Sequence, residues 1–306
     1  MNFGPLLLDR FYAVECFSRP GNNPKATLAD ISPSGGGLFQ SIAMAKAGID
    51  VRHAGAVGRD GAPILEALKA SGASCELVSE RDSENGHRIL QLNSHGNTCC
   101  FTCEGDNNHM PQEEIDRIFE SLSGDEFISV NSAAQSAAYI VQKAAQMGMQ
   151  TSLKASVEDT ERLLSVDLAN IKYLALNLEA GLALTGQKRP TDALDKLLKR
   201  FRHLKITLTL GRSGSFYAAS NLRLRQCAMR APEVDLSCAG DAFYGHFLAR
   251  TLAGAPPWTA LSQASRAAAL AVARPGTYAS IPDREETLTF RESMSVLESV
   301  MATGSY

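Results

Sequence analysis

The chain has 306 residues, of which 44% are hydrophobic and 21% charged, as in an ordinary soluble globular protein. A formal net charge of -3 without a basic stripe argues against a nucleic-acid-binding surface, and no apolar run reaches the ~18 residues of a membrane span. The first residues carry no charged segment followed by a long apolar stretch, so we expect a cytoplasmic protein that interacts with neither nucleic acid nor membrane.

Two extended regions near the N-terminus interrupt the regular pattern of the chain. The first covers residues 11–34 and contains several prolines, which disfavour a helix. The second consists of 88–92 and 99–103, which alternate polar and apolar residues around 94–97, a segment typical of a hairpin turn. Both regions are predicted to form a small β-element outside the main sheet.

The remaining chain alternates between strand-like and helix-like segments. The predicted strands are 51–57, 75–79, 126–131, 151–155, 173–177 and 205–210. The predicted helices are 41–48, 62–71, 134–147, 191–203, 240–253, 258–273 and 285–302. Repeated strand–helix units predict a parallel sheet with helices on both faces, and such sheets bind ligands at the carboxyl ends of their strands.

The cysteines and histidines give no metal or redox signature. The seven cysteines are scattered and odd in number, so we expect free thiols in a reducing compartment. Cys100 and Cys103 have the spacing of a C-x-x-C motif, but in a strand the two side chains would face opposite sides. The six histidines also lack the spacing of metal ligands.

The most informative segment is 235–243, where small residues lead into Asp241 at the start of a predicted helix. The backbone N–H groups and the dipole of a helix N-terminus attract a phosphate. A carboxylate at the same point can accept the proton of an attacking hydroxyl. An anion cradle beside a base is what phosphoryl transfer to an alcohol requires.

Three other features are open to two interpretations each. The glycine run 34–37 either packs backbone against a polar ligand or forms a flexible loop. The strand and glycine turn at 208–214 either hold nucleotide phosphates or form a plain hairpin with 215–219. Asp9, which follows an apolar stretch, either caps a turn or grips ligand hydroxyls, since a buried carboxylate needs a partner.

Taken in their order along the chain, the sequence motifs resemble those of the PfkB family of carbohydrate kinases from end to end. The matching segments are Asn2-Phe3-Gly4 with Asp9, GGGLFQSIAMAKAG at 35–48, HAGAVGRDG at 53–61, DLSCAGD at 235–241 and ALAVARPGTYASIP at 269–282. The resemblance implies one ribokinase-like domain over residues 1–306, a three-layer α/β/α sandwich with a central, mostly parallel sheet. It also implies a small β-lid, formed by about 10–34 and 86–104, that closes over the sugar and can join two copies into a homodimer.

The resemblance further implies transfer of the γ-phosphoryl group of ATP to a hydroxyl of a small sugar or sugar-like alcohol, with Mg²⁺ accompanying ATP. Asp241 would be the base, and the anion hole would comprise Cys238, Ala239 and Gly240. The sugar would contact Asp9, Gly35, Gly36, Gly37, Phe39 and Ser132. The nucleotide would contact Asn177, Thr209, Gly211, Gly214 and Ser265. A monovalent cation such as K⁺ would lie near Asp235, Ser237 and Ser280.

The sugar-binding positions depart from the family pattern. Leu7 and Phe39 stand where many members have asparagine, and Ser132 stands where some have a glutamate. Each change removes or weakens a polar contact to the sugar, and loss of a hydrogen-bond partner for a hydroxyl can cost on the order of 10⁴ in discrimination. We therefore expect an acceptor less polar than ribose, or one contacted by an aromatic face such as that of Phe39.

The residues predicted to contact the nucleotide and its phosphates also depart from the family pattern. The N-x-x-E motif, which helps to organise Mg²⁺, retains Asn177 but has Ala180 in place of the glutamate, so that Glu179 is the nearest carboxylate. Cys238 replaces a glycine of the anion hole. The alternative function is therefore a catalytically weak or inactive relative that only binds sugar or nucleotide. A nicotinamide-dependent oxidoreductase is disfavoured because no G-x-G-x-x-G follows the first strand.

Overall fold

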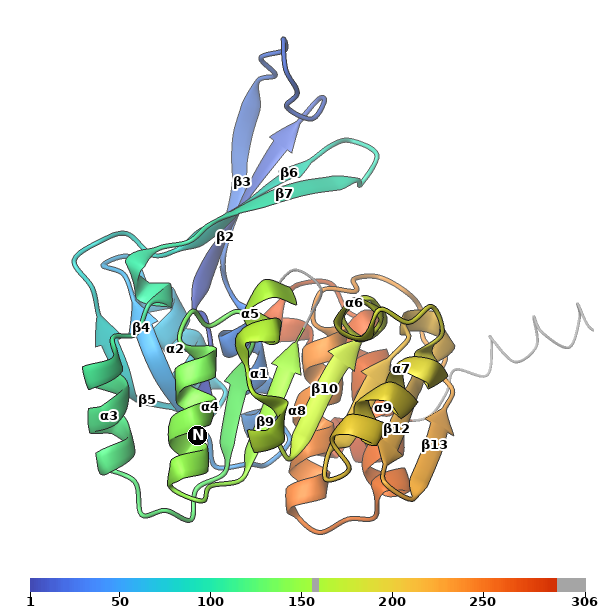
Figure 1. The fold of residues 1–306 in the computed structure, drawn as a ribbon. Coiled ribbons are helices and arrows are strands. Elements are labelled where there is room, and N and C mark those ends of the chain that lie inside the picture. The colour runs from blue at the N-terminus through green and yellow to red at the C-terminus, as the bar shows by residue number, and fades with distance from the viewer. Residues whose placement is uncertain (156–159, 291–306) are drawn as a thin grey trace, which may run out of the picture.

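The computed structural model describes residues 1–155 and 160–290, which form one large and one small β-sheet (Figure 1). The strand order of the large sheet is β13-β12-β11-β10-β9-β8-β1-β4-β5. Neighbours from β11 to β5 are parallel, and β12 and β13 extend one edge in antiparallel fashion. Its strands are β1 (Asn2–Phe3), β4 (Arg52–Val57), β5 (Ser74–Glu80), β8 (Ile128–Asn131), β9 (Thr151–Ala155), β10 (Tyr173–Asn177), β11 (Lys205–Thr209), β12 (Ser215–Ala219) and β13 (Leu222–Gln226).

Helices cover both faces of the large sheet, which gives the predicted three-layer α/β/α sandwich (Figure 1). One layer consists of α1 (Gly36–Lys46), α2 (Ala62–Ala70), α8 (Ala239–Leu252) and α9 (Pro257–Val272), with the short α10 (Arg284–Thr289) against α9. The other consists of α3 (Gln112–Glu120), α4 (Ala137–Gln146), α5 (Thr160–Ser165), α6 (Leu178–Thr185) and α7 (Pro190–Arg200).

Two apolar clusters join the helical layers to the sheet. On the α3 and α4 side, Phe3 of β1 stacks on Phe119 with ring centroids 5.8 Å apart. On the α1 and α2 side, Leu38 and Ile64 are fully buried in the second cluster. Burying one such side chain contributes ~1.5–3 kcal/mol, so the sandwich is held mainly by these two interfaces.

Most predicted elements are present, and the differences have identifiable causes. The strands at 151–155 and 173–177 match β9 and β10 end for end. The helix predicted from residue 41 begins at Gly36, because burial of its apolar side chains outweighs the low helix propensity of glycine. Helices α3, α5 and α6 and strand β13 were not predicted. The last predicted helix, 285–302, is observed as α10, and its residues from 291 onward lie outside the described chain.

The small sheet unites the two extended regions that the sequence separates. Its order is β3-β2-β6-β7, with β2 (Leu7–Val14) paired antiparallel to β3 (Ala26–Ser34) and parallel to β6 (His87–Leu92). The hairpin from β6 to β7 (Thr98–Cys103) closes with a 3.2 Å hydrogen bond from the Asn93 amide to the Asn97 carbonyl. This sheet, called the lid sheet below, projects from one end of the large sheet (Figure 1).

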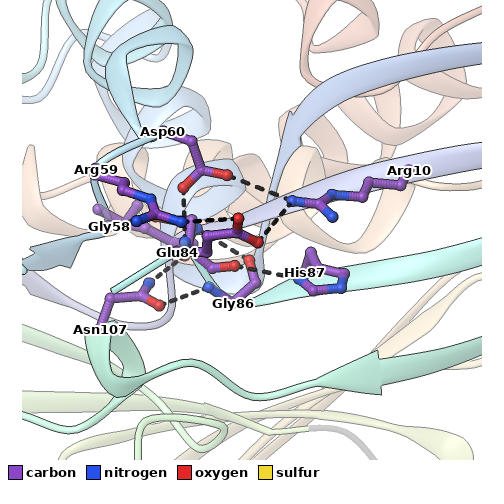
Figure 2. Close-up of polar contacts among 10 residues, drawn as sticks. Arg10, Gly58, Arg59, Asp60, Glu84, Gly86, His87 and Asn107 are labelled. Carbon is purple, nitrogen blue, oxygen red and sulfur yellow. Dashed lines mark hydrogen bonds and ion pairs between the residues drawn. The ribbon is translucent and has the colours of Figure 1, made fainter. Parts of the chain in front are cut away.

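The segment HAGAVGRDG fixes the base of the lid sheet (Figure 2). Asn85 is the central residue: its amide donates to Asp60 Oδ1 at 2.6 Å, and its Oδ1 accepts from the Gly58 amide at 2.8 Å. A side chain at Gly58 would lie 2.3 Å from the Asn85 nitrogen, so only glycine allows this approach. Arg10 of β2 contacts Asp60 at 3.5 Å from the other side. The motif therefore acts as an anchor for the chain that enters the lid.

His53 is a titratable group in the core. It is fully buried on β4, and its Nδ1 lies 2.8 Å from Ser41 Oγ of α1. Desolvation by burial lowers the pKa of His53 from 6.5 to about 4. The native state therefore keeps this imidazole neutral in a range where the unfolded chain binds a proton.

We expect His53 to make the protein sensitive to acid. Between pH 6.5 and about 4 the unfolded state binds more protons, so the free energy of unfolding falls as the pH falls through this window, by up to on the order of 3 kcal/mol. Urea unfolding of His53→Gln should show a flatter dependence there than the wild type. His203→Gln, at an exposed position, is the matched control and should retain the wild-type slope. Identical slopes for all three proteins would contradict this role.

Candidate active site

A cavity of about 750 Å³ lies at the carboxyl ends of the parallel strands, below the lid sheet. Strand β1 lies between β8 and β4, so the order of the strands along the chain reverses direction at β1. Open α/β sheets bind ligands at such a switch point. The cavity is lined there by residues that follow or end strands, including Pro5, Asn131, Lys154, Asn177 and Thr209.

The start of α8 faces this cavity. Asp241, in the first turn, is 7% exposed and lines the cavity together with Gly240. Within the described chain, no protein acceptor is within hydrogen-bond range of the Gly240 or Asp241 amide, whereas the Ala239 amide donates to the Leu236 carbonyl at 3.3 Å. The Cys238 amide likewise has no acceptor among the described residues, so two of the three amides predicted for the anion hole, those of Cys238 and Gly240, are uncommitted.

Gly240 and Cys238 occupy contrasting environments. A side chain at Gly240 would meet nothing within 4 Å, so the glycine leaves open space beside the two amides. Cys238 is 2% exposed and has a φ of -107°, which any L-residue adopts. Burial, and then the charge of Asp241, raise the pKa of its thiol, so Cys238 stays neutral. The substitution of this glycine by cysteine is therefore accommodated without backbone strain.

Lys154, on β9, forms an ion pair with Asp241 that the sequence interpretation missed. Its Nζ lies 2.8 Å from Asp241 Oδ1, and the two side chains are 20% and 10% exposed. This separation is that of a charge-assisted contact, so the buried Oδ1 is paired with the lysine ammonium. The sequence held one signal for this role: Lys154 is the single charged residue of β9 and lies near its carboxyl end, where ligands of such sheets bind.

Asp9 lies in the lid sheet rather than at the end of a strand of the large sheet. It is 1% exposed, and both of its oxygens accept hydrogen bonds from Arg88, at 2.7 Å from Nε and 2.6 Å from Nη2. Asp9 and Arg88 are direct register partners on β2 and β6, and Arg88 also donates to Ser34 Oγ at 2.8 Å. Neither of the two interpretations of Asp9 anticipated this cross-strand pair.

The lid side of the cavity has an apolar wall. Four of its lining side chains are Leu7, Phe11, Phe39 and Leu90. Phe39, which stands in place of a polar residue, lines this cavity, and its contact with a sugar stays a prediction.

The glycines predicted to contact the sugar have separate structural roles. Gly35 has a φ of +106°, and a side chain there would lie 2.4 Å from the Pro5 carbonyl oxygen. Gly36 lies against the amide of Asn131, and both residues line the cavity. Gly37 instead packs on the backbone of Gly4 and does not line it. Ser132 is buried outside the lining, with its amide bonded to the Lys154 carbonyl at 3.0 Å.

A second cavity of about 310 Å³ adjoins the first. The two share Gly240, Thr209 and Phe243. Four of the predicted nucleotide positions line the second cavity: Thr209, Gly211, Gly214 and Ser265. Its remaining wall includes apolar residues from α9, which suits a planar base.

Asn177 lines the large cavity but has a structural role at the N-terminus of α6. Its Oδ1 accepts a 2.8 Å hydrogen bond from the Ala180 amide and so caps the helix. Glu179 is exposed and does not line either cavity, and Ala180 is buried. The carboxylate missing at position 180 is therefore not replaced by its neighbour.

The three residues predicted to bind a monovalent cation differ in whether they line the large cavity. Asp235 Oδ1 accepts from the Ser237 amide at 2.8 Å and from its hydroxyl at 2.5 Å, and both residues line the large cavity. Ser280 is buried outside it and donates to the Thr277 carbonyl at 2.8 Å. No group of three or more acidic, histidine or cysteine side chains suited to a metal occurs in residues 1–155 and 160–290.

Known proteins resemble the chain over nearly its full length. A family model described as pfkB family carbohydrate kinase matches residues 4–284. The chain is 25% identical over 295 residues to a ribokinase of Staphylococcus aureus (92% of this chain, 96% of the relative) and 24% identical over 307 residues to a deoxyribokinase of Salmonella typhi (96% and 98%). The structure of Arabidopsis thaliana ribokinase complexed with ribose and ATP superposes with a TM-score of 0.79 at 22% identity, covering 95% of this chain and 98% of that one.

The helices were also compared with the requirements of a membrane span. Over residues 1–155 and 160–290, none combines the length and apolar character needed to cross a lipid bilayer.

Proposed function

The chain belongs to the pfkB family of carbohydrate kinases, and on this premise we propose that it transfers the γ-phosphoryl group of ATP to a hydroxyl of a small sugar or sugar-like alcohol. One observation carries the proposal: the Asp241 carboxylate and the uncommitted amides of Gly240 and Asp241 border the same cavity. A base and an anion-binding helix terminus at one point supply both requirements of the reaction.

In this mechanism Asp241 takes the proton of the acceptor hydroxyl as that oxygen attacks the γ-phosphorus. The amides of Gly240 and Asp241 stabilise the charge on the transferring group, and the open space at Gly240 admits it. Mg²⁺ bound with ATP would neutralise phosphate charge near Asn177, the polar residue at the end of β10. The arrangement of the cation-site residues gives no support for K⁺, and no step is assigned to it.

The two cavities suggest where the substrates bind. The smaller one, lined by Thr209, Gly211, Gly214 and Ser265, is proposed to hold the nucleoside of ATP. The acceptor would lie under the lid sheet, against the Asp9–Arg88 pair and the apolar wall that includes Phe39. Relatives of the chain include proteins named ribokinase and deoxyribokinase, which supports a sugar as the acceptor. Lid closure would exclude water and so suppress ATP hydrolysis.

The outer face of the lid sheet supports a homodimer. Leu28, Ile31 and Phe101 are 48%, 48% and 51% exposed. Because Ile31 pairs with Arg10 and Phe101 with Ile89, while Asp9 and Arg88 face the cavity, these side chains lie on the opposite side of the sheet. Burial of this face against a second copy would remove apolar surface from water.

All seven cysteines are free, which suits the reducing cytoplasm proposed for an ATP-dependent kinase.

An acceptor screen tests the proposed function. The protein is incubated with ATP, Mg²⁺ and a panel of pentoses, deoxypentoses, hexoses and nucleosides, and release of ADP is measured. We expect acceptor-dependent ADP release that exceeds release with ATP alone. Ribose should give a kcat/KM more than about tenfold below that of the best acceptor, because polar contacts at Leu7, Phe39 and Ser132 are lost.

The same screen distinguishes an active kinase from the alternative, a relative that only binds sugar or nucleotide. Saturable thermal stabilisation by ATP or by a sugar, without turnover of any acceptor, would indicate a protein that only binds its ligands. Efficient turnover of ribose would contradict the expected preference for a less polar acceptor while leaving the kinase assignment intact.

A further inference from the structure

We propose that Lys154 is the positioning residue for Asp241: it holds the carboxylate in its reactive orientation from the end of β9, an inference that rests on the proposed function. The sequence interpretation gave Lys154 no role. Its Nζ lies 2.8 Å from Asp241 Oδ1 in an ion pair that is mostly screened from solvent. Both residues line the large cavity.

A second contact between the same two elements sets the geometry of this pair. The Tyr244 hydroxyl lies 2.6 Å from Ser152 Oγ of β9 and 2.9 Å from Ser129 Oγ of β8. Ser152 and Lys154 are two residues apart on a strand and share one face. Asp241 and Tyr244 are three residues apart on α8 and share one face of the helix.

Two points of contact therefore fix the first turn of α8 against β9. Tyr244 is buried, and burial raises its pKa to about 12, so its hydroxyl stays protonated and anchors the helix at neutral pH. With the helix fixed at Tyr244, the charge on Lys154 selects the Asp241 orientation that faces the cavity. Among the described residues, Lys154 is the charged partner of the Asp241 carboxylate.

A carboxylate has two oxygens, so a paired Asp241 can still act as a base. Lys154 contacts Oδ1, and Oδ2 is left for an incoming hydroxyl. Lys154 thus orients Asp241 by charge while the acceptor supplies the hydrogen bond. A lysine that acts in this way affects the reaction only through Asp241.

A double-mutant cycle tests the proposal. Lys154→Met, Asp241→Asn and the double variant are compared with the wild type, using the best acceptor of the screen and ATP. Lys154→Met should lower kcat about 10- to 100-fold, the range for loss of a contact to a charged group. In the Asp241→Asn background the same change should lower kcat less than about threefold. Lys154→Arg, which keeps the charge, should recover a substantial part of the loss.

A second measurement requires no substrate. The urea midpoints of the four ligand-free proteins should shift non-additively, because Lys154 and Asp241 contact each other in the native state. Lys172→Met is the matched control. Lys172 precedes β10, at the end of the strands opposite to the cavity, and contacts Gln150. Its replacement should leave kcat unchanged.

Each remaining outcome overturns the proposal. An equal loss from Lys154→Met in both backgrounds would mean that the lysine acts on the phosphoryl group directly. A loss of stability without a loss of kcat would mean a purely structural role. If Asp241→Asn alone leaves kcat intact, Asp241 is not the base and the proposed function fails. If Asp241→Asn abolishes turnover but Lys154→Met leaves the wild-type kcat unchanged, only the inference on Lys154 fails.

Discussion

Replacement of Asp241 by asparagine should lower kcat by about 10²–10⁴-fold, the usual contribution of a positioned general base. Asparagine has nearly the same shape but cannot accept the proton of the acceptor hydroxyl. It also loses the charge that pairs with Lys154 at 2.8 Å. The measurement is acceptor-dependent ADP release under saturating ATP and acceptor, with KM values determined separately.

Two controls make the Asp241→Asn result interpretable. Asp195→Asn makes the same chemical change at a side chain that is 68% exposed and paired with Arg223, and its kcat should equal that of the wild type. Thermal stabilisation by ATP should persist in Asp241→Asn, because the backbone amides of the helix terminus are retained. A variant that keeps more than about one tenth of wild-type kcat would exclude Asp241 as the base.

Replacement of Arg88 by methionine should destabilise the protein by about 3–5 kcal/mol, because it leaves the Asp9 carboxylate buried without a partner. Asp9 is 1% exposed, and both of its oxygens depend on Arg88 for hydrogen bonds of 2.7 and 2.6 Å. Urea unfolding followed by circular dichroism measures the loss. Acceptor affinity should fall in parallel, since the pair forms part of the lid-side wall of the cavity.

The control for Arg88 is an exposed ion pair at the base of the same sheet. Arg59 and Glu84 contact each other at 3.0 Å with side chains 66% and 53% exposed, so Arg59→Met should cost no more than about 1 kcal/mol. The double variant Asp9→Leu/Arg88→Met removes both charges and should regain most of the lost stability. Equal destabilisation by Arg88→Met and Arg59→Met would refute the role of the buried pair.

The parallel sheet with helices on both faces follows from local patterns in the sequence, and the family from the resemblance of its motifs. Short apolar runs such as 151–155 and 173–177 identified buried strands, and their alternation with helices indicated a parallel sheet. The segment around Asp241 identified a helix terminus with a carboxylate in its first turn, which the structure places at the cavity. These features depend on residues close to one another in the chain, so periodicity and spacing are sufficient to predict them.

The partners of the charged site residues did not follow from the sequence. Asp9 and Arg88 are separated by 79 positions, and they meet because β2 and β6 are neighbours in the lid sheet. Asp60 and Asn85 meet in the same way at the base of that sheet. The register of strands far apart in sequence depends on the packing of the whole fold, which no local pattern encodes.

The sequence by itself determined which chemical groups this protein can bring to a reaction: a carboxylate at a helix N-terminus, glycine-rich turns, and apolar residues at positions predicted to contact a sugar. Only the tertiary structure decided how these groups are paired, with Lys154 on Asp241 and Arg88 on Asp9. The physical reason is that a charge buried by folding must find its partner among residues that the fold brings near, whatever their separation along the chain.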